Sequence, residues 1–253
     1  MNDPAATQRA HFDRLIERYE AHYDDATSQQ YRRRFWYAPL FAGLDLRGRV
    51  VLEAMCGSGQ TTGYLLERGA RVTGLEISGV AIESFRRRWP DAASVCSSIL
   101  DTGLADASFD GVVVIGGLHH LHPRVADAVD EIHRLLKPGG WFCFGEPHTG
   151  SLPDVLRRWW YQRDALFEDS EAAIDIGALR RTNAGRFTFE FERYVGNLAY
   201  LLVLNSMIFR IPRGLKRFYA PPLLALERVI GLVQGRRTTC FAIGRWRKRE
   251  KCR

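Results

Sequence analysis

The sequence lacks the features that mark a secreted chain or a metal centre. Its five cysteines (Cys56, Cys96, Cys143, Cys240, Cys252) are odd in number and scattered. They form no Cys-x-x-Cys pair and none lies at zinc-ligand spacing with histidine, so we predict no metal. The N-terminal stretch has mixed charges at helical spacing and no apolar region typical of a signal peptide. These absences predict a cytoplasmic setting with unpaired thiols.

Outside a short C-terminal segment, the chain also lacks an excess of charge. The formal net charge is +7, from 36 Lys+Arg and 29 Asp+Glu. Residues 236–253 hold eight of these bases and one acid, so residues 1–235 are formally neutral. Nucleic-acid-binding proteins spread positive charge over a wide face. We therefore expect no nucleic-acid partner.

No repeat, low-complexity stretch or long linker divides the 253 residues. The composition, 46% hydrophobic and 26% charged, is that of an ordinary globular protein. We predict a single domain over residues 1–253. Its expected parts are an N-terminal helical cover (1–45), a core (48–148), a substrate or lid region (149–235), and a last strand with a basic tail (236–253).

The core alternates short apolar runs with amphipathic stretches. The expected strands are "RVVLEAM", "ARVTGLEI", residues 92–97, "FDGVVVIGG" and "GGWFCFGEP", and the expected helices cover 59–68, 78–88 and 123–137. This alternation predicts an α/β three-layer sandwich with a mostly parallel, doubly wound sheet. Right-handed crossovers then place the strand-to-helix loops at one edge of the sheet.

The flanking segments predict N-terminal helices and a C-terminal helical insertion that forms a lid. Leucine and aromatic residues recur there at helical spacing, and one segment alternates as a strand does. The expected helices cover 5–24, 28–42, 151–167, 170–182 and 221–233, the last opened by proline, and the expected strands cover 186–194 and 238–249.

The stretch "VVLEAMCGSGQTTGY" ends a buried strand in a glycine loop that opens a helix. A dinucleotide-binding loop needs a glycine at the sixth position, but counting from Gly57 that position holds Thr62. Glu53, just before the loop, is poorly placed beside a pyrophosphate and well placed beside a cation. The loop therefore favours S-adenosylmethionine, which carries a sulfonium and an ammonium group and no phosphate, over a nicotinamide or flavin cofactor.

An acid in the second strand supports this interpretation. Glu76 ends "VTGLE", 19 residues after Gly57, about where a ribose-binding acid falls in such a sheet. An ionised carboxylate can accept hydrogen bonds from both ribose hydroxyls.

Four motifs together resemble the class I S-adenosylmethionine-dependent methyltransferases, which have a seven-stranded relative of the Rossmann fold. They are "VLEAMCGSG", "VTGLEIS", "SFDGVVVIGGLHHL" and "EIHRLLKPGGWFCFGEP", in this order over residues 48–148. The resemblance makes this core the cofactor-binding part and implies an enzyme. The residues that it implies for cofactor binding are Glu53, Ala54, Met55, Cys56, Gly57, Gly59, Glu76, Ile77, Ser98, Ile99 and Gly116.

Two positions depart from the family pattern. Ser98 stands where many members have an aspartate beside the adenine, and the neighbouring Asp101 could substitute for it. Met55 stands where many have the first glycine of the loop, which suggests that this position can keep a Cβ.

Histidines follow the fourth and fifth strands. His119, His120 and His122 come after the fourth, and Glu146 and His148 end the fifth. A histidine that titrates near neutrality can deprotonate a hydroxyl, so we predict His119, His120 and His148 as catalytic. The alternative is that "LHHL" contacts the cofactor or packs, as in relatives with other substrates.

The segment Leu198–Phe209 is apolar on nearly all sides and has a basic flank that includes Arg213 and Arg217. It is shorter than the about 20 residues of a membrane-spanning helix. Three alternatives remain open: a lid over an apolar pocket, peripheral contact with the inner face of a membrane, or a homodimer interface. The resemblance favours the lid.

We therefore predict methyl transfer to a small-molecule or lipid-like, amphiphilic acceptor, at oxygen because histidines could serve as bases. An RNA or protein methyltransferase is disfavoured by the charge and by "GGLHHL", which replaces an Asn/Asp-Pro-Pro-Tyr element after the fourth strand. A non-catalytic S-adenosylmethionine-binding partner protein is the third hypothesis.

Overall fold

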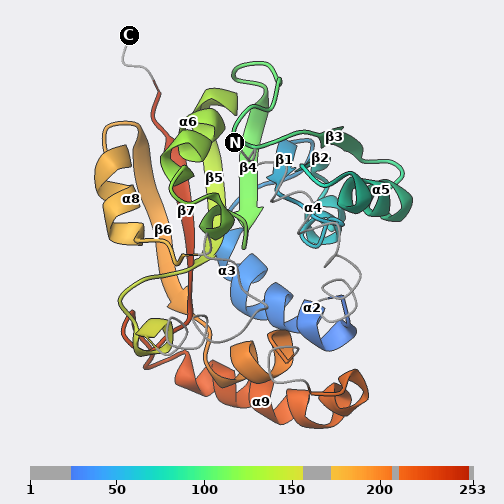
Figure 1. The fold of residues 1–253 in the computed structure, drawn as a ribbon, viewed down its shortest axis with the longest axis vertical. Helices are drawn as coiled ribbons and strands as arrows, with labels where there is room; N and C mark the ends of the chain where they lie inside the picture. The colour runs from blue at the N-terminus through green and yellow to red at the C-terminus, as the bar shows by residue number, and fades with distance from the viewer. Residues whose placement is uncertain (1–23, 156–171, 207–210, 251–253) are drawn as a thin grey trace, which may run out of the picture.

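The computed structural model describes residues 24–155, 172–206 and 211–250, and in them a seven-stranded sheet has the order β3-β2-β1-β4-β5-β7-β6 (Figure 1). Strands β1 to β5 pair in parallel, whereas β7 is antiparallel to both β5 and β6. This confirms the predicted mostly parallel α/β sheet. The strands are β1 (Val50–Ala54), β2 (Arg71–Glu76), β3 (Ala93–Cys96), β4 (Phe109–Ile115), β5 (Leu136–Pro147), β6 (Phe187–Val195) and β7 (Phe241–Lys248).

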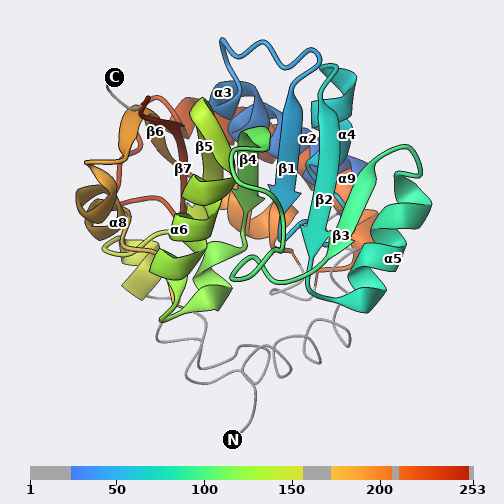
Figure 2. The ribbon, with the colours of Figure 1, turned by 90° about the horizontal axis from the view of Figure 1, so that it is seen from above.

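Two hydrophobic cores lie on opposite faces of the sheet because side chains alternate along each strand. In β1, Leu52 and Ala54 belong to one core and Val51 to the other. Helices cover both faces (Figure 2). The first core includes residues of α6 (Val125–Leu135) and α8 (Ile176–Asn183), and the second includes residues of α2 (Ala26–Arg32), η1 (Arg33–Tyr37), α3 (Ala38–Leu40) and α4 (Thr62–Glu67).

Most expected helices in the described residues are present with small shifts. The predicted helix 28–42 is the continuous run α2, η1 and α3, and the predicted helix 78–88 is α5 (Gly79–Arg88). The helix predicted from residue 170 begins later, at Ile176, because the Asp175 side chain accepts from Ala178 N at 2.9 Å and caps it there. Residues 5–23 of the helix predicted at 5–24, and residues 156–167 of that predicted at 151–167, lie outside the described residues.

The prediction that a proline opens the C-terminal helix is wrong. After a 3₁₀ turn, η4 (Arg213–Leu215), helix α9 runs over Lys216–Ile230 with Pro221 and Pro222 inside it. A proline cannot donate to the carbonyl four residues earlier. Here both prolines are on the exposed side of the helix, where solvent can serve the carbonyls left without an amide donor.

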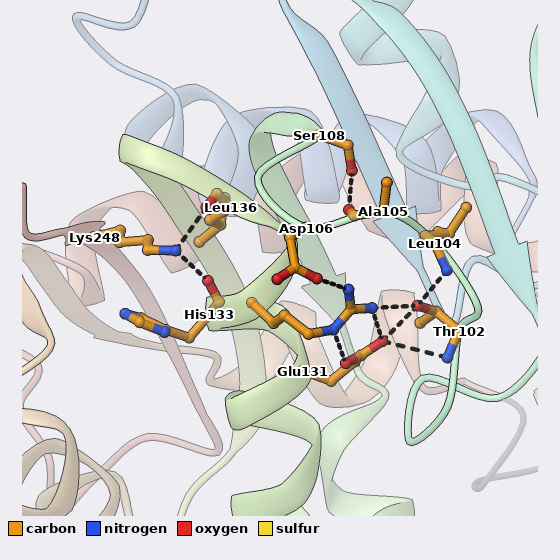
Figure 3. A network of polar contacts seen from close by, with 10 residues as sticks. Thr102, Leu104, Ala105, Asp106, Ser108, Glu131, His133, Leu136 and Lys248 are labelled. Atoms are coloured by element: carbon orange, nitrogen blue, oxygen red, sulfur yellow. Dashed lines mark hydrogen bonds and ion pairs between the residues drawn. The ribbon is translucent and has the colours of Figure 1, made fainter.

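A polar network at the C-terminal end of α6 ties this helix to the sheet and to the loop before β4 (Figure 3). Arg134 donates to Glu131 and to Asp106, and Glu131 also accepts from Thr102. Lys248 Nζ donates to the carbonyls of His133 at 2.7 Å and Leu136 at 2.8 Å. A cation there is favoured because the carbonyls of a helix C-terminus carry partial negative charge.

Within the described residues, strand β7 builds part of the predicted basic tail into the fold. Strand β7 lies between β5 and β6, and Arg245 donates to the carbonyls of Leu40 at 3.1 Å and Ala42 at 2.8 Å. Arg247 pairs with Glu190 and donates to the Gly139 carbonyl at 2.8 Å. The end of β7 also points away from α9 (Figure 1). These bases therefore serve internal contacts on the side of the molecule opposite the insertion.

The C-terminal insertion packs on the N-terminal helix α2. Tyr31 OH donates to Glu227 Oε1 at 3.1 Å, and Lys216 Nζ lies 2.6 Å from Asp25 Oδ2. Tyr200, in the π-helical turn η3 (Tyr200–Leu204), has its ring 6.4 Å from that of Tyr31. None of the helices in the described ranges is long and apolar enough to cross a bilayer.

Candidate active site

A cavity of about 150 Å³ lies at the carboxyl ends of β1, β2 and β4. It brings together most of the residues that the sequence predicted for a cofactor site. From that set it is lined by Glu53, Ala54, Met55, Cys56, Gly57, Glu76, Ile77, Ser98, Ile99 and Gly116. His120, which the sequence predicted as catalytic, also lines it. Residues that the sequence did not predict also line it, among them Arg32, Tyr37, Gln60, Thr61 and Gly117.

Glu76 is the best-held acid of the cavity. Its Oε1 accepts from the amides of Ile77 at 2.8 Å and Ser78 at 3.0 Å, and its Oε2 accepts from Gly57 N at 3.0 Å. Burial raises the pKa of this carboxyl, and the three amide bonds oppose that rise. The carboxylate therefore joins the end of β2 to the glycine loop while it lines the cavity.

Glu53 holds the same loop from its other side. Its carboxylate accepts from Thr61 N at 2.9 Å and from the Thr62 hydroxyl, at the start of α4. Burial raises the pKa of Glu53 to about 7 against these hydrogen bonds. A cation in the cavity would favour the ionised form of this carboxyl.

The loop between these acids has the backbone of a glycine turn. Met55, Gly57 and Gly59 have φ angles of 55°, 54° and 83°, which is left-handed backbone that favours glycine. Met55 therefore keeps a Cβ at a strained position. Gly59 does not line the cavity; a Cβ there would meet Trp89 Nε1 at 2.5 Å, and this indole donates to the carbonyls of Ser58 at 3.0 Å and Gly59 at 3.1 Å.

The loop after β3 contributes Ser98 and Ile99 to the cavity wall. Ser98 Oγ accepts from Leu100 N at 3.2 Å, which shapes the turn after β3. Asp101 is exposed and does not line the cavity. The structure therefore does not support the suggestion that Asp101 replaces the aspartate found in many relatives.

The N-terminal helix supplies a cation that the sequence did not predict. Arg32 ends α2, is buried, and donates through Nη1 to Gln60 Oε1 in the glycine loop. Tyr37 OH donates to the Gln60 carbonyl at 3.4 Å. The sequence predicted only that N-terminal helices cover the core, and this prediction did not identify which of their side chains face the cavity.

His119 and His120 lie in the 3₁₀ turn η2 (Leu118–Leu121), beside a buried acid. Glu146 Oε1 accepts from the amides of Gly117 at 2.9 Å and Leu118 at 2.8 Å. Its Oε2 lies 2.8 Å from His119 Nδ1. The rings of His119 and His120 are 3.9 Å apart between centroids, and His120 lines the cavity while His119 does not.

This arrangement makes Glu146 the residue that orders the histidine turn. Burial raises its pKa to about 7, against the hydrogen bonds that it accepts from the turn. A carboxylate on Nδ1 fixes the ring orientation of a histidine and leaves Nε2 for another partner.

His148 does not reach the cavity. Its ring is buried between Thr149, whose carbonyl lies 3.1 Å from Nδ1, and Thr239, whose Oγ1 lies 3.2 Å from Nε2. The ring also packs edge-on against Tyr194. His122 likewise does not line the cavity. The geometry thus gives His148 a packing role and does not support the prediction that it is catalytic.

The lining residues fit a cationic nucleoside. Two buried carboxylates with raised pKa values, Glu53 and Glu76, line one small cavity, and a positively charged ligand would offset the cost of ionising them. Gly57 and Gly116 have left-handed backbone, and added Cβ atoms would meet nothing within 4 Å. A ligand can therefore approach the backbone closely there.

Comparisons with known proteins agree with this fit. A family described as a methyltransferase domain matches residues 52–144. The chain is 35% identical over 213 residues to the fatty-acid O-methyltransferase of Mycolicibacterium smegmatis, covering 81% of this chain and 72% of that protein. It is 34% identical over 119 residues to an uncharacterized methyltransferase of Synechocystis sp., covering 47% of this chain and little more than half, 56%, of that protein.

The fold is shared with solved structures. The 1,6-didemethyltoxoflavin-N1-methyltransferase of Burkholderia thailandensis, solved with S-adenosylhomocysteine, superposes with a TM-score of 0.60 at 20% identity, covering 99% of this chain and 92% of that one. The sheet order and the acid-lined cavity define an α/β enzyme with a nucleoside cofactor. The chain belongs to the class I S-adenosylmethionine-dependent methyltransferases, and its cofactor is S-adenosylmethionine.

Proposed function

We propose that this enzyme transfers a methyl group from S-adenosylmethionine to an oxygen of a lipid-like carboxylic acid. One observation carries the choice of acceptor. The match to the fatty-acid O-methyltransferase covers 81% of the chain, so it extends well beyond the cofactor-binding residues 52–144 into the region expected to recognise the acceptor. An amphiphilic acceptor also agrees with the apolar insertion.

The cavity residues divide the work of holding the cofactor, which supplies a methyl group already activated on a sulfonium. Glu76 would accept from the ribose hydroxyls while the amides of Gly57, Ile77 and Ser78 hold its carboxylate in place. Glu53 holds the loop through Thr61 and adds negative charge near the cationic end. Ser98 and Ile99 would flank the adenine, and backbone amides of the loop would meet the methionine end.

The histidine turn would place the acceptor. Methyl transfer is an in-line displacement, so the enzyme contributes mainly proximity and alignment. A carboxylic acid is ionised at neutral pH because its pKa is about 4, and its oxygen needs no base. On such an acceptor His120, which lines the cavity, would donate a hydrogen bond and orient the carboxylate. On a hydroxyl acceptor it would instead accept the proton.

Substitution separates these two roles. Asparagine keeps an N–H donor at this position but cannot accept a proton as a base. We expect His120→Asn to keep most of the activity on a carboxylic acid and His120→Ala to lose it. A loss on the acid in His120→Asn as large as that in His120→Ala would show that a base is required.

The acceptor itself is tested with methyl-labelled cofactor. We expect label in long-chain fatty acids, recovered as an alkali-labile methyl ester in the organic phase, and none in fatty alcohols or amines of equal length. Label in RNA or protein would favour the first alternative function. Tight cofactor binding without release of S-adenosylhomocysteine on any acceptor would favour the second, a non-catalytic binding partner.

An amphiphilic acceptor would also bring the enzyme to the surface on which it is presented. We therefore propose peripheral contact with the inner face of a membrane as part of this function. The insertion that packs on α2 would take part in the acceptor side, as a lid or as the contacting surface.

A further inference from the structure

One face of α9 is apolar and exposed. Among the residues that the structure describes, ten large hydrophobic side chains are exposed, and six of them lie in or beside α9. The six are Leu215, Phe218, Leu226, Val229, Leu232 and Val233, between 41% and 87% exposed. Three of them, Phe218, Leu226 and Val229, lie within α9 and at 100° per residue fall within one stripe about 80° wide. The other three lie in the turns directly before and after the helix. An apolar stripe of this kind marks a surface that contacts something other than water.

The exposed charges beside this stripe are all positive within described residues 214–237. Arg217 and Arg228 flank it on one side, and Arg236 and Arg237 follow it. The one acid of the segment, Glu227, is buried and accepts from Asn197 N at 2.7 Å and Ala199 N at 2.9 Å. The surface is therefore complementary to an apolar partner with negative charge at its boundary.

The opposite face of α9 connects this surface to the active site. Glu227 accepts from Tyr31 OH at 3.1 Å, and the next residue of α2, Arg32, lines the cofactor cavity. Helices α2 and α9 lie side by side (Figure 1). A partner seated on the exposed stripe would thus be separated from the cavity by α9 and α2, which Glu227 and Tyr31 join.

We propose that this face of α9 docks the enzyme in the plane of an anionic lipid membrane, with the stripe in the acyl boundary and the arginines among the headgroups. A second copy of the chain fits less well, because a two-fold contact between identical stripes would bring arginines together with no exposed acid on the segment to pair them. Membrane docking itself does not depend on the proposed function. Only its purpose, the capture of a lipid-like acceptor, rests on that function.

The test is co-sedimentation of the full chain with vesicles of phosphatidylcholine alone or with added phosphatidylglycerol. We expect binding to the anionic vesicles only. Phe218→Asp/Val229→Asp should abolish it, and Arg217→Gln/Arg228→Gln should weaken it roughly 30-fold, from about 1 kcal/mol per arginine. The matched controls, Val80→Asp and Arg71→Gln/Arg87→Gln, change exposed residues elsewhere and should bind as the wild type does.

Affinity for S-adenosylhomocysteine, measured for every variant, reports that the cavity is folded. Wild type that does not bind anionic vesicles, or folded α9 variants that bind them as well as the wild type, would overturn the proposal. The proposal would also be overturned if the wild type were a dimer that Phe218→Asp converts to a monomer without changing vesicle binding. Vesicle binding with no methylation of any acid would instead defeat the proposed acceptor and leave docking intact.

Discussion

Two buried glutamates, Glu76 in β2 and Glu227 in α9, both accept hydrogen bonds from backbone amides but have different roles. Glu76 accepts from three amides at the carboxyl end of β2, and Glu227, on the buried face of α9, accepts from two amides and the Tyr31 hydroxyl. Burial raises the pKa of both. Only Glu76 lines the cavity. A buried, raised-pKa acid is therefore not by itself a sign of a site; access to a cavity separates the ligand-binding glutamate from the structural one.

The largest effect expected on the cavity side comes from the loop that Glu76 holds. Gly57→Val puts a β-branched residue at a φ of 54° and fills the space where a ligand meets the backbone. We expect cofactor affinity to fall by more than about 100-fold, from strain and lost contact. Gly79→Val is the control, since a Cβ there meets nothing within 4 Å and its φ is not left-handed. Equal affinities by calorimetry would show that the loop does not hold the cofactor.

The next effect concerns turnover. Glu146→Gln removes the charged partner of His119 Nδ1, which lies 2.8 Å away. We expect kcat to fall by about 10- to 100-fold, with the affinity for S-adenosylhomocysteine nearly unchanged. His119→Asn should show the same loss, and the double variant should lose no more than either single one. Additive losses would mean that the two residues act separately.

The structural glutamate should affect stability alone. Glu227→Gln weakens the buried hydrogen bonds from Asn197 N and Ala199 N, and Tyr31→Phe removes the third. We expect the free energy of unfolding in urea to fall by about 1–3 kcal/mol for each change. A variant that is as stable as the wild type but no longer binds the cofactor would contradict the purely structural role of Glu227.

Glu53 should change the free energy of unfolding in a pH-dependent way, by an amount similar to or smaller than that expected for Glu227. Burial raises its pKa from 4.5 to about 7 in the folded chain. Between these pH values the folded state holds a proton that the unfolded state has lost, so this carboxyl destabilises the fold as the pH rises. Wild type should therefore lose up to about 3 kcal/mol relative to Glu53→Gln between pH 4.5 and 7. A stability difference that stays constant in urea titrations at both pH values would refute this.

The smallest effect is expected at Met55. Its φ of 55° costs a non-glycine residue about 1 kcal/mol, and glycine would remove this strain while adding freedom to the unfolded chain. Met55→Gly should therefore change the melting temperature by only a few degrees. A loss of cofactor affinity as large as that expected for Gly57→Val would mean that the Met55 side chain itself supports the site.

The sequence predicted the sheet and the donor side of the cavity because both follow from local patterns. Strand periodicity and right-handed crossovers bring the ends of β1, β2 and β4 to one edge. Spacing along the chain is then enough to place Glu53, Gly57 and Glu76 together.

What the sequence could not predict depends on contacts between distant segments. The Trp89 indole reaches the glycine loop from the far end of α5, and Arg32 enters the cavity from α2. His148 follows the last residue of β5, Pro147, so strand alternation no longer fixes its direction. The prediction for the start of α9 was wrong because a proline need not mark the first turn of a helix. It can also lie inside a helix where solvent satisfies the carbonyl that its missing N–H leaves without a donor.

The most direct test of this account measures the dissociation constant of S-adenosylhomocysteine for Glu76→Gln and Glu227→Gln side by side. An amide at residue 76 cannot make the charge-assisted bonds of a carboxylate to the ribose hydroxyls. Glu76→Gln should therefore bind about 10- to 100-fold more weakly, whereas Glu227→Gln should stay within about twofold of the wild type. Equal losses in the two variants, or a loss in Glu227→Gln alone, would contradict the assignment of Glu76 to the cofactor.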